Sequence, residues 1–307
     1  MDSLCGVAQW PVNTVAVAVV DASGAVLGSY GPQDWPFRLA SVTKLLSAYA
    51  VLLAVEEGAV DWDQPAGPPD STVRHLLAHT SGLAFDSAQI VAAPGTKRIY
   101  SNTGFAVLAD TVAAASGIRF NDYLAEGVLQ PLGMAVSRLE GPAGYGAVST
   151  CADLARFAAE LQAPTLLATQ TLAEATQVAY PGLDGLLPGF GMQRPNDWGL
   201  GFELRDHKSP HWTGSRNSPG AFGHFGQSGT FLWVDPVAGA ACVALTDRDF
   251  GPWARNAWPA FSDSVLAELR TRSLAAFWGQ NAVIPNAVLP TLRDGARRAR
   301  RWRRPRR

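Results

Sequence analysis

The stretch Phe37-Arg-Leu-Ala-Ser-Val-Thr-Lys44 leads directly into a long apolar segment. Ten residues from Leu45 onward include only one serine and one tyrosine among aliphatic side chains, as in a buried helix that ends near Gly58. Three-residue spacing places Ser41 and Lys44 on one face of such a helix. The stretch therefore predicts a hydroxyl and an amine within hydrogen-bond reach at the start of a buried helix.

This pair suits a nucleophile and its base. A serine hydroxyl attacks a carbonyl at neutral pH only if a base takes its proton, and an amine is that base only when burial or a nearby positive charge lowers its pKa. Backbone N–H groups at the helix start favour developing negative charge. Lysine is rare in this chain, which has only Lys44, Lys97 and Lys208. The alternative interpretation is a capping serine followed by a surface lysine.

Two further short segments carry groups that suit the same chemistry. Tyr100 is a phenol that can act as base or proton relay, and the Asn102 amide can hold the lysine or a substrate carbonyl. In the stretch from Gly223 to Gln227, the residue after Gly226 offers an N–H that can pair with that of Ser41 to bind an oxyanion. A lone H-x-G is otherwise a turn that enters a strand.

The rest of the chain predicts an α+β fold. Strands are expected at 14–21 and 26–30, which form a hairpin, and at 199–204, 229–234 and 240–246. Helices are expected at 73–78, 105–115, 152–161 and 260–277, with the caps Ser71, Ser116-Gly117 and Ser149 or Thr150 for the first three. We therefore expect an antiparallel sheet flanked by helices and built from both chain ends, with an inserted, mostly α-helical lobe.

Composition predicts a globular protein with a charged end. The 307 residues are 47% hydrophobic and 17% charged. Residues 1–292 are expected to form a single catalytic domain, with a sheet lobe at about 1–60 and 181–280 and a helical lobe at about 61–180. Residues 293–307 hold nine arginines and Asp294, a net charge of +8, which leaves −9 for the remainder because the chain carries −1. This block predicts a flexible tail that is a candidate for weak contact with nucleic acid or an anionic membrane. A solvated tail is the alternative.

Several classes of protein are disfavoured. No export signal or membrane-spanning run is visible, which predicts a cytoplasmic protein. The three cysteines lie far apart and are expected to be buried apolar residues: Cys5, Cys151 and Cys242. Two histidine pairs have the i, i+4 spacing of zinc ligands, but neither has the glutamate of H-E-x-x-H: His75 with His79, and His207 with His211. We therefore expect no metal and no cofactor.

In their order, the three segments resemble the marks of the serine β-lactamase and penicillin-binding-protein superfamily, which are S-x-x-K, Y-x-N, and K-T-G or H-x-G. Further stretches resemble the class C β-lactamase-related branch over about residues 13–275. They are His75-Leu-Leu-Ala-His-Thr-Ser-Gly-Leu83, Tyr100-Ser-Asn-Thr-Gly104, Ser149-Thr-Cys-Ala-Asp-Leu-Ala-Arg-Phe157, Trp198-Gly-Leu-Gly-Phe202 and Leu232-Trp-Val-Asp-Pro236. The resemblance implies a β-lactamase/transpeptidase-like fold.

The resemblance also implies a ping-pong acyl transfer. Ser41 would be acylated, Lys44 and Tyr100 would move protons, and water would release the acid. The oxyanion would rest on the N–H groups of Ser41 and Gln227. The substrate-binding residues would be Asn102, His224 and Gly226. Nothing resembles the E-x-x-L-N segment that supplies the deacylating glutamate of class A enzymes, so the same proton-transfer residues would also serve deacylation.

Two departures from the family pattern bear on the substrate. His224 replaces the lysine of K-T-G, so the fixed charge that receives a β-lactam or peptide carboxylate is missing or pH-dependent. Phe225 replaces a hydroxyl residue. Among small esters, amides and lactams, both changes favour neutral esters or amides, as in family VIII-like esterases. The family's leading helix is expected to be absent or shortened, because the first predicted strand starts almost at the beginning of the chain.

Alternative interpretations stay open at this point. One is a β-lactamase or a D-alanyl or D-amino-acid peptidase; others are a catalytically silent binding or sensor protein on the same fold and an RNA-associated protein. An α/β-hydrolase is disfavoured because its G-x-S-x-G elbow is absent. Residues 214–220 are expected to form a mobile loop near the site. The oligomeric state is left open.

Overall fold

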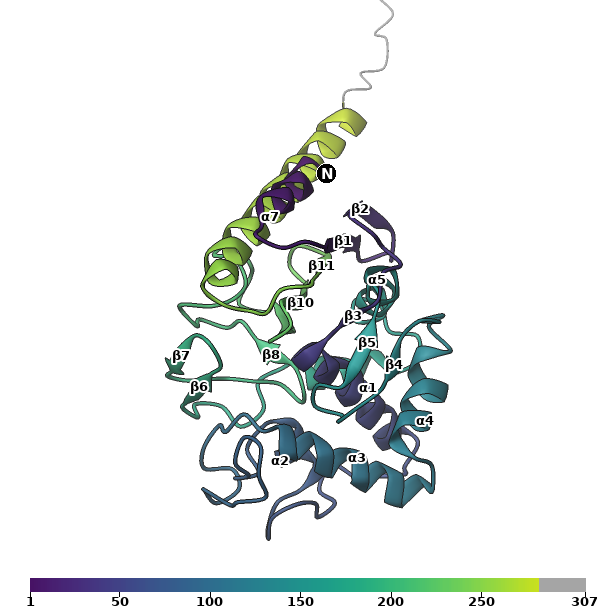
Figure 1. Ribbon diagram of the computed structural model, residues 1–307, viewed down its shortest axis with the longest axis vertical. Helices are drawn as coiled ribbons and strands as arrows, with labels where there is room; N and C mark the ends of the chain where they lie inside the picture. Colours follow the sequence, from purple (N-terminus) through teal and green to yellow (C-terminus); the bar gives the residue numbers. More distant parts are fainter. Residues whose placement is uncertain (282–307) are drawn as a thin grey trace, which may run out of the picture. The chain divides into compact units, whose positions relative to one another are not determined.

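A six-stranded antiparallel sheet joins the two ends of the sequence (Figure 1). Its strand order is β2-β1-β11-β10-β9-β8. The strands are β1 Val15–Asp21, β2 Val26–Tyr30, β8 Glu203–Leu204, β9 Phe222–Gly226, β10 Thr230–Asp235 and β11 Ala240–Thr246. Strands β1 and β11, the first and last strands among the described residues, are neighbours, with Val15 opposite Thr246 and Asp21 opposite Ala240. This arrangement confirms the predicted α+β class and the sheet built from both chain ends.

The central strands of this sheet are covered on both faces, which is why β1 and β11 are apolar runs without alternation. Alternate side chains of a strand point to opposite faces. Ala18 and Val20 belong to a core cluster shared with two helices, α1 Thr43–Glu56 and α5 Cys151–Glu160. Val17 and Val19 belong to a second cluster, shared with the 3₁₀ helix η1 Asp2–Gln9 and the first part of α7 Pro252–Asn281.

The middle of the chain is mainly helical. Its helical elements are the 3₁₀ helix η2 Ala40–Val42, α2 Val73–Leu77, α3 Asn102–Ser116, α4 Phe120–Leu124, the π-helical η3 Ala125–Leu129 and α6 Thr169–Ala175. Five short strands accompany them: β3 Phe37–Arg38, β4 Arg138–Leu139, β5 Ala147–Ser149, β6 Gly185–Leu187 and β7 Gly191–Gln193. The first three form a small sheet in the order β3-β5-β4, which anchors the residues just before Ser41, and the last two form a hairpin.

Helix ends agree with the predicted caps except at α2. Thr150 caps α5 by accepting a hydrogen bond from the Asp153 N–H, and Gly117 ends α3 with a φ of 72°. At α2 the cap is Thr72 instead of the predicted Ser71, and its side chain accepts from the His75 N–H. A cap must lie two or three residues before the N–H that it satisfies, so one residue of error changes which side chain does this.

Several element boundaries differ from the prediction. Only Glu203 and Leu204 of the expected strand at 199–204 join the sheet, because Gly201, with a φ of 88°, turns the backbone and donates its N–H to the Leu77 carbonyl. The H-x-G segment, for which a turn was the alternative interpretation, lies in the strand β9. The last helix starts at Pro252, before the expected position near 260, because proline suits a first helical turn.

The structure describes residues 1–281. Met1–Arg270 and Thr271–Arg307 form separate units. The predicted tail at 293–307 lies outside the described residues, and the division of residues 1–292 into two lobes stays a prediction. The described residues begin with the eight-residue 3₁₀ helix η1, and the expectation of an absent or shortened leading helix stays a prediction. Across the described part of the chain, we find no helix with the length and apolar character needed to cross a membrane.

Candidate functional site

Ser41 lies in η2, the single 3₁₀ turn before α1, and not in the α-helix itself. Its side chain is partly exposed, whereas the residues after it, from Val42 on, are buried. Ala40, directly before it, has a φ of 45°, which a non-glycine residue rarely adopts. Such strain persists only where the surroundings hold the backbone in place, and it is typical of functional sites.

The β9–β10 hairpin holds the turn that carries Ser41. Thr230 Oγ1 donates to the Leu39 carbonyl at 2.8 Å, and Ser228 Oγ donates to the Arg38 carbonyl at 2.6 Å. A Cβ atom on Gly226 would lie only 2.2 Å from the Leu39 oxygen. Glycine is therefore required for β9 to approach this turn, and the predicted H-x-G segment does meet the S-x-x-K segment.

Lys44 projects from the first turn of α1 and is completely buried. Its Nζ donates to Asn102 Oδ1 at 2.6 Å and to the Gly144 carbonyl at 2.8 Å. Burial lowers the pKa of Lys44 well below its usual value, against an opposing effect of Asp86. A neutral amine has two N–H groups and one lone pair. Because both N–H groups have acceptors, the lone pair is left to take a proton.

Tyr100 packs beside this amine, with Lys44 Nζ 4.5 Å from the centroid of its ring. Burial raises the pKa of Tyr100 above its usual value, although the hydrogen bond with Ser41 acts in the opposite direction. The phenol therefore stays protonated at neutral pH. Of the two roles predicted for it, this state favours a proton relay over a phenolate base.

Asn102 is oriented by an aspartate that the sequence did not single out. Asn102 Nδ2 donates to Asp86 Oδ1 at 2.8 Å, which turns the amide oxygen toward Lys44. The loop that carries Asp86 is joined to the Tyr100 segment, since the Asn102 N–H donates to the Phe85 carbonyl at 2.8 Å. A lone aspartate in a loop has no motif, so only the tertiary contact identifies it.

His224 lies in β9, buried against Tyr100 and Trp198, with ring centroids 5.7 and 5.5 Å away. Its Nδ1 is 2.6 Å from the Phe225 carbonyl, and because a carbonyl only accepts, this nitrogen carries the proton. Burial, together with the nearby Lys44, lowers the pKa of His224 to about 3. The side chain is therefore neutral at pH 7.

His79 is a second buried histidine beside Tyr100, and the sequence indicated it only as half of a zinc-like pair and as part of a stretch that resembles the family. Its ring centroid lies 4.7 Å from that of Tyr100 and 4.8 Å from that of Trp198. The Ser101 N–H donates to its Nδ1 at 3.2 Å, and burial lowers its pKa well below the usual value. Two neutral imidazoles therefore flank the phenol.

The predicted oxyanion residue Gln227 follows β9 and is exposed. Its carbonyl accepts from the Phe250 N–H at 2.7 Å, and its side-chain Nε2 donates to the Phe250 carbonyl at 3.3 Å. These bonds hold the backbone next to Gly226. The assignment of its N–H to an oxyanion stays a prediction.

Comparison with known proteins decides the family. The β-lactamase family model matches residues 7–267. This chain belongs to the β-lactamase family. A solved structure described as a β-lactamase from Mycobacterium bovis is 59% identical, with a TM-score of 0.86 over 87% of this chain and 99% of the other. The fold is therefore that of a β-lactamase-type serine hydrolase, which confirms the resemblance read from the motifs.

More distant relatives cover less of the sequence or share only the fold. The D-alanyl-D-alanine-carboxypeptidase/endopeptidase AmpH of Escherichia coli K12 is 29% identical over 167 residues, 39% of this chain and 43% of AmpH, so the match spans less than half of that relative. EstCE1, described as a hydrolase with promiscuous acyltransferase activity, has a TM-score of 0.66 at 19% identity over 83% of this chain and 96% of EstCE1.

The histidines of the two zinc-like pairs have different surroundings in this β-lactamase-family chain. His75 hydrogen-bonds with Thr72 and stacks on Tyr180, away from the partners of His79. His207 is exposed, whereas His211 is buried. Among residues 1–281 we find no group of three or more His, Cys, Asp or Glu side chains placed to hold a metal ion. Cys151 and Cys242 are buried as predicted, but Cys5 is exposed, contrary to the prediction.

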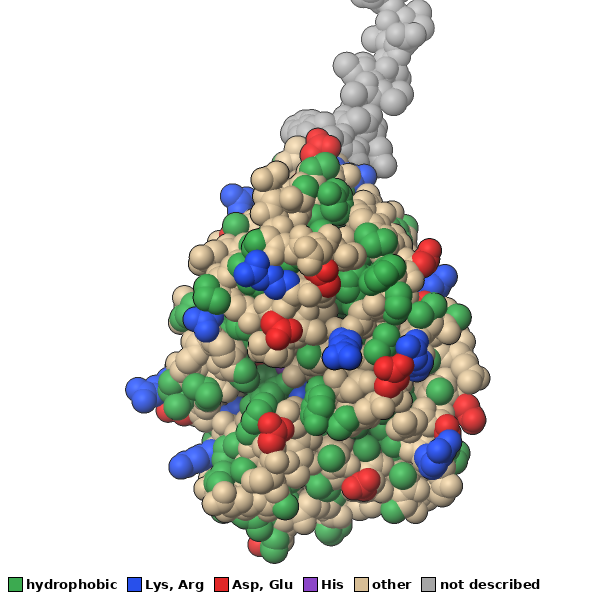
Figure 2. All heavy atoms as spheres, viewed as in Figure 1, with side chains coloured by type: hydrophobic (Ala, Val, Ile, Leu, Met, Phe, Trp, Pro, Cys, Tyr) green, Lys and Arg blue, Asp and Glu red, His purple; other side chains and the backbone are tan. Residues whose placement is uncertain are grey.

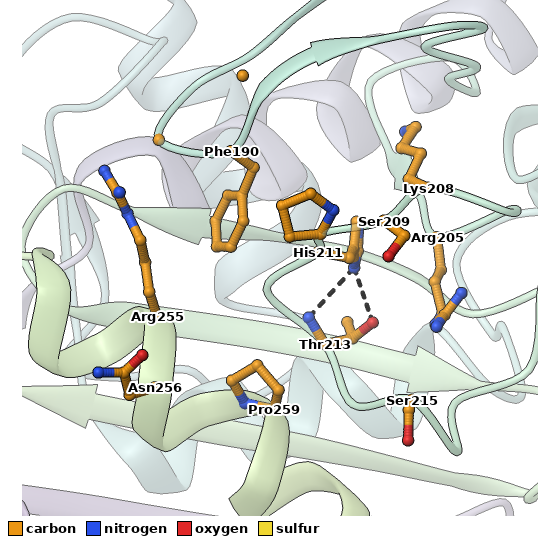
Figure 3. Close-up of a pocket in the computed structure, with 13 residues that line it drawn as sticks. Phe190, Arg205, Lys208, Ser209, His211, Thr213, Ser215, Arg255, Asn256 and Pro259 are labelled. Carbon is orange, nitrogen blue, oxygen red and sulfur yellow. Dashed lines mark hydrogen bonds between the residues drawn. The ribbon is translucent and has the colours of Figure 1, made fainter.

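The loop at 214–220, expected to be mobile and near the site, makes several hydrogen bonds. Gly214 N–H donates to Asn217 Oδ1, Ser218 donates to Asp235, and Ser215 donates to Asp263. Its mobility stays a prediction. Ser215 lines a pocket of about 720 Å³ that the catalytic candidates do not line (Figure 3).

A buried ionic cluster is centred on Glu203 and includes Lys208 and His211, which also line that pocket. Its carboxylate accepts from Lys208 Nζ, from Trp212 Nε1 at 2.9 Å and from His211 Nε2 at 2.9 Å. His211 is in turn hydrogen-bonded to Thr213 (Figure 3). Burial alone would raise the pKa of Glu203, but the adjacent charges outweigh it and lower the pKa to about 2. The ionised carboxylate therefore stabilises the fold above pH 4.5, and this contribution is lost as the pH falls toward 2.

Replacing Glu203 by glutamine should lower the free energy of unfolding by about 3–5 kcal/mol at pH 7, because the buried Lys208 charge loses its partner. Urea denaturation measures this change. The matched control is Glu174→Gln, which removes an exposed ion pair with Arg74 and should cost under about 1 kcal/mol. Equal losses in the two variants would contradict the prediction.

Proposed function

We propose that this protein is a serine hydrolase that forms an acyl-enzyme on Ser41 and has carboxylesterase-type activity on small esters or amides. The neutral Lys44 amine accepts the Ser41 proton as the hydroxyl attacks the carbonyl carbon. The N–H groups of Ser41 and Gln227 bind the oxygen that becomes negative. Tyr100 relays a proton to the leaving alkoxide or amine, so the first step ends with a covalent ester on Ser41.

Deacylation reverses these roles, with water in place of the leaving group. Lys44 and Tyr100 take a proton from the attacking water, and Ser41 recovers its hydrogen when the acid leaves. Asn102 orients the amine through its amide oxygen, and Asp86 orients that amide. His224 and Gly226 border the substrate at β9.

The preference for esters rests on one observation, the neutral state of His224. A lysine at this position carries a fixed charge for a substrate carboxylate, whereas the pKa of His224, lowered to about 3, leaves none at pH 7. A hydrogen bond to a charged group is worth about 1.5–3 kcal/mol. Without this hydrogen bond, kcat/KM for a carboxylate-bearing substrate should be about 10- to 100-fold lower than it would be with a charged lysine at this position.

A β-lactamase or D-alanyl peptidase activity is the second candidate. It is favoured by the similarity to the protein described as a β-lactamase from Mycobacterium bovis and to the D-alanyl-D-alanine-carboxypeptidase AmpH. The catalytic steps at Ser41 would be the same. The two candidates differ in whether the substrate carries a carboxylate, and this makes them separable by substrate.

Purified protein should hydrolyse p-nitrophenyl butyrate with a kcat/KM at least about 10-fold above that for nitrocefin, because nitrocefin carries a carboxylate and His224 offers it no charge. Parallel assays with an N-acylated D-alanyl-D-alanine peptide, which ends in a carboxylate, test the peptidase alternative. Faster turnover of nitrocefin or of the peptide would overturn the ester preference. No turnover of any of the three substrates, together with no covalent labelling of Ser41, would instead support a silent binding protein.

A further inference from the structure

Two large apolar side chains of the β6–β7 hairpin line a pocket that is also lined by Tyr100. Leu186 and Met192 are directly opposite each other in the hairpin and are 57% and 56% exposed. Phe85, 51% exposed, lines the same pocket and stacks on the Tyr100 ring with centroids 5.8 Å apart. Hydrophobic side chains also gather around a hollow on the face of the molecule seen in Figure 2.

This pocket is built into the fold and does not depend on a ligand to shape it. Arg98 forms a parallel bridge with Gly185, and its N–H donates to the Asp184 carbonyl at 3.2 Å, which joins the hairpin to the segment that carries Tyr100. A Cβ on Gly185 would lie 2.5 Å from the Arg98 oxygen, so the approach requires glycine. The pocket volume of about 830 Å³ lies within the range of about 300–1,000 Å³ typical of small-molecule sites.

The charged groups that line the pocket leave its interior suited to an apolar occupant. The Arg98 guanidinium is buried and donates to the carbonyls of Ala78, Asn196, Ala179 and Tyr180. Arg194 forms an exposed ion pair with Asp184, and Lys97 is exposed. An apolar group that covered Phe85, Leu186 and Met192 would remove their exposed surface from water, which is the main source of apolar binding free energy.

We propose that this pocket binds the acyl chain of the substrate and that the substrate class is esters of medium-chain apolar acids. The inference rests on the proposed function, because Tyr100 links the pocket to the carbonyl attacked by Ser41. Each added methylene that enters the pocket should raise kcat/KM by up to about fourfold. Chains that outgrow the pocket should gain nothing more.

The test compares p-nitrophenyl acetate, butyrate, hexanoate and octanoate, and the readout is the ratio of kcat/KM for octanoate to that for acetate. The native protein should give a ratio of at least about 30. Octanoate has six more methylenes than acetate, and this ratio requires only part of the fourfold gain from each of them. The double variant Leu186→Asn/Met192→Asn should reduce this ratio at least about fivefold. Because both side chains are exposed, their replacement leaves the buried core intact.

Two further variants keep the test specific. The matched control is Val237→Asn, which alters a large apolar side chain that is 82% exposed and lies outside the pocket, and it should retain the native ratio. The single variant Leu186→Asn should give an intermediate ratio. A native ratio near one, or the same ratio in the double variant as in the native protein, would overturn the inference.

Failure of the inference can be told from failure of the proposed function. Acetate turnover and covalent labelling of Ser41 test the function alone, whatever the chain-length dependence. Equilibrium dialysis of p-nitrophenyl octanoate against the Ser41→Ala variant tests the pocket without turnover. Saturable binding that weakens at least about fivefold on adding Leu186→Asn/Met192→Asn supports the inference, whereas binding that this change does not weaken contradicts it.

Discussion

Replacing Ser41 by alanine is expected to lower kcat/KM for p-nitrophenyl butyrate by about 10⁴-fold or more and to abolish labelling by a fluorophosphonate probe. Without the hydroxyl no acyl-enzyme forms, and removal of a catalytic nucleophile in serine hydrolases has effects of this size. The side chain is small and partly exposed, so its loss should leave folding unchanged. Steady-state kinetics and intact mass after labelling measure the two effects.

The matched control for Ser41→Ala is Ser47→Ala on the same stretch of chain. Ser47 is buried in α1, and its Oγ donates to the Ala143 carbonyl at 2.6 Å, so this variant loses a serine hydroxyl and some stability. It should keep its labelling by the probe. Labelling of Ser41→Ala at the native rate, with one adduct per chain, would show that the nucleophile is another residue.

Replacing Lys44 by methionine is expected to lower kcat/KM by about 10²–10⁴-fold, the range typical of a lost general base. Methionine has a similar length and suits a completely buried position, so the protein should fold. Ser41 would remain but would lack an acceptor for its proton, and labelling by the probe should slow in parallel. The control is Lys97→Met at an exposed lysine, which should label at the native rate.

The pH dependence separates a buried base from an ordinary lysine. Burial lowers the pKa of Lys44 well below 10.5, so the amine is neutral at lower pH than an exposed lysine would be. Activity requires the neutral form. The value of kcat/KM should therefore stop rising with pH well below 10.5, once the buried amine is neutral. A tenfold rise per pH unit that continues to pH 10 would show an unshifted lysine and contradict the proposed role.

Much of the fold was predictable because its signals are local. The apolar runs of β1 and β11 and the cap of α5 by Thr150 depend on neighbouring residues. The prediction failed where distant contacts decide the backbone. Gly201 leaves the strand pattern because its N–H bonds to Leu77, and β9 became a strand because Leu232 of β10 pairs with His224.

In the candidate site, too, local signals predicted some residues and distant contacts decided the others. The three-residue spacing of Ser41 and Lys44, together with the resemblance of the Tyr100 segment to the Y-x-N of the family, was enough to select these residues as candidates. Nothing local identified Asp86 as the partner of Asn102, or His79 as a neighbour of Tyr100. Such contacts join loops and helices that are far apart in the chain, and no residue pattern records them.

The sequence by itself determined which functional groups are available to this protein: a serine and a lysine one helical turn apart, a phenol, an amide, and a histidine in place of the lysine of the K-T-G motif. The tertiary structure alone decided their protonation states and their surroundings. Removal from water lowers the pKa of Lys44 and of His224 and raises that of Tyr100, and this effect depends on what packs around each group and not on its neighbours in sequence.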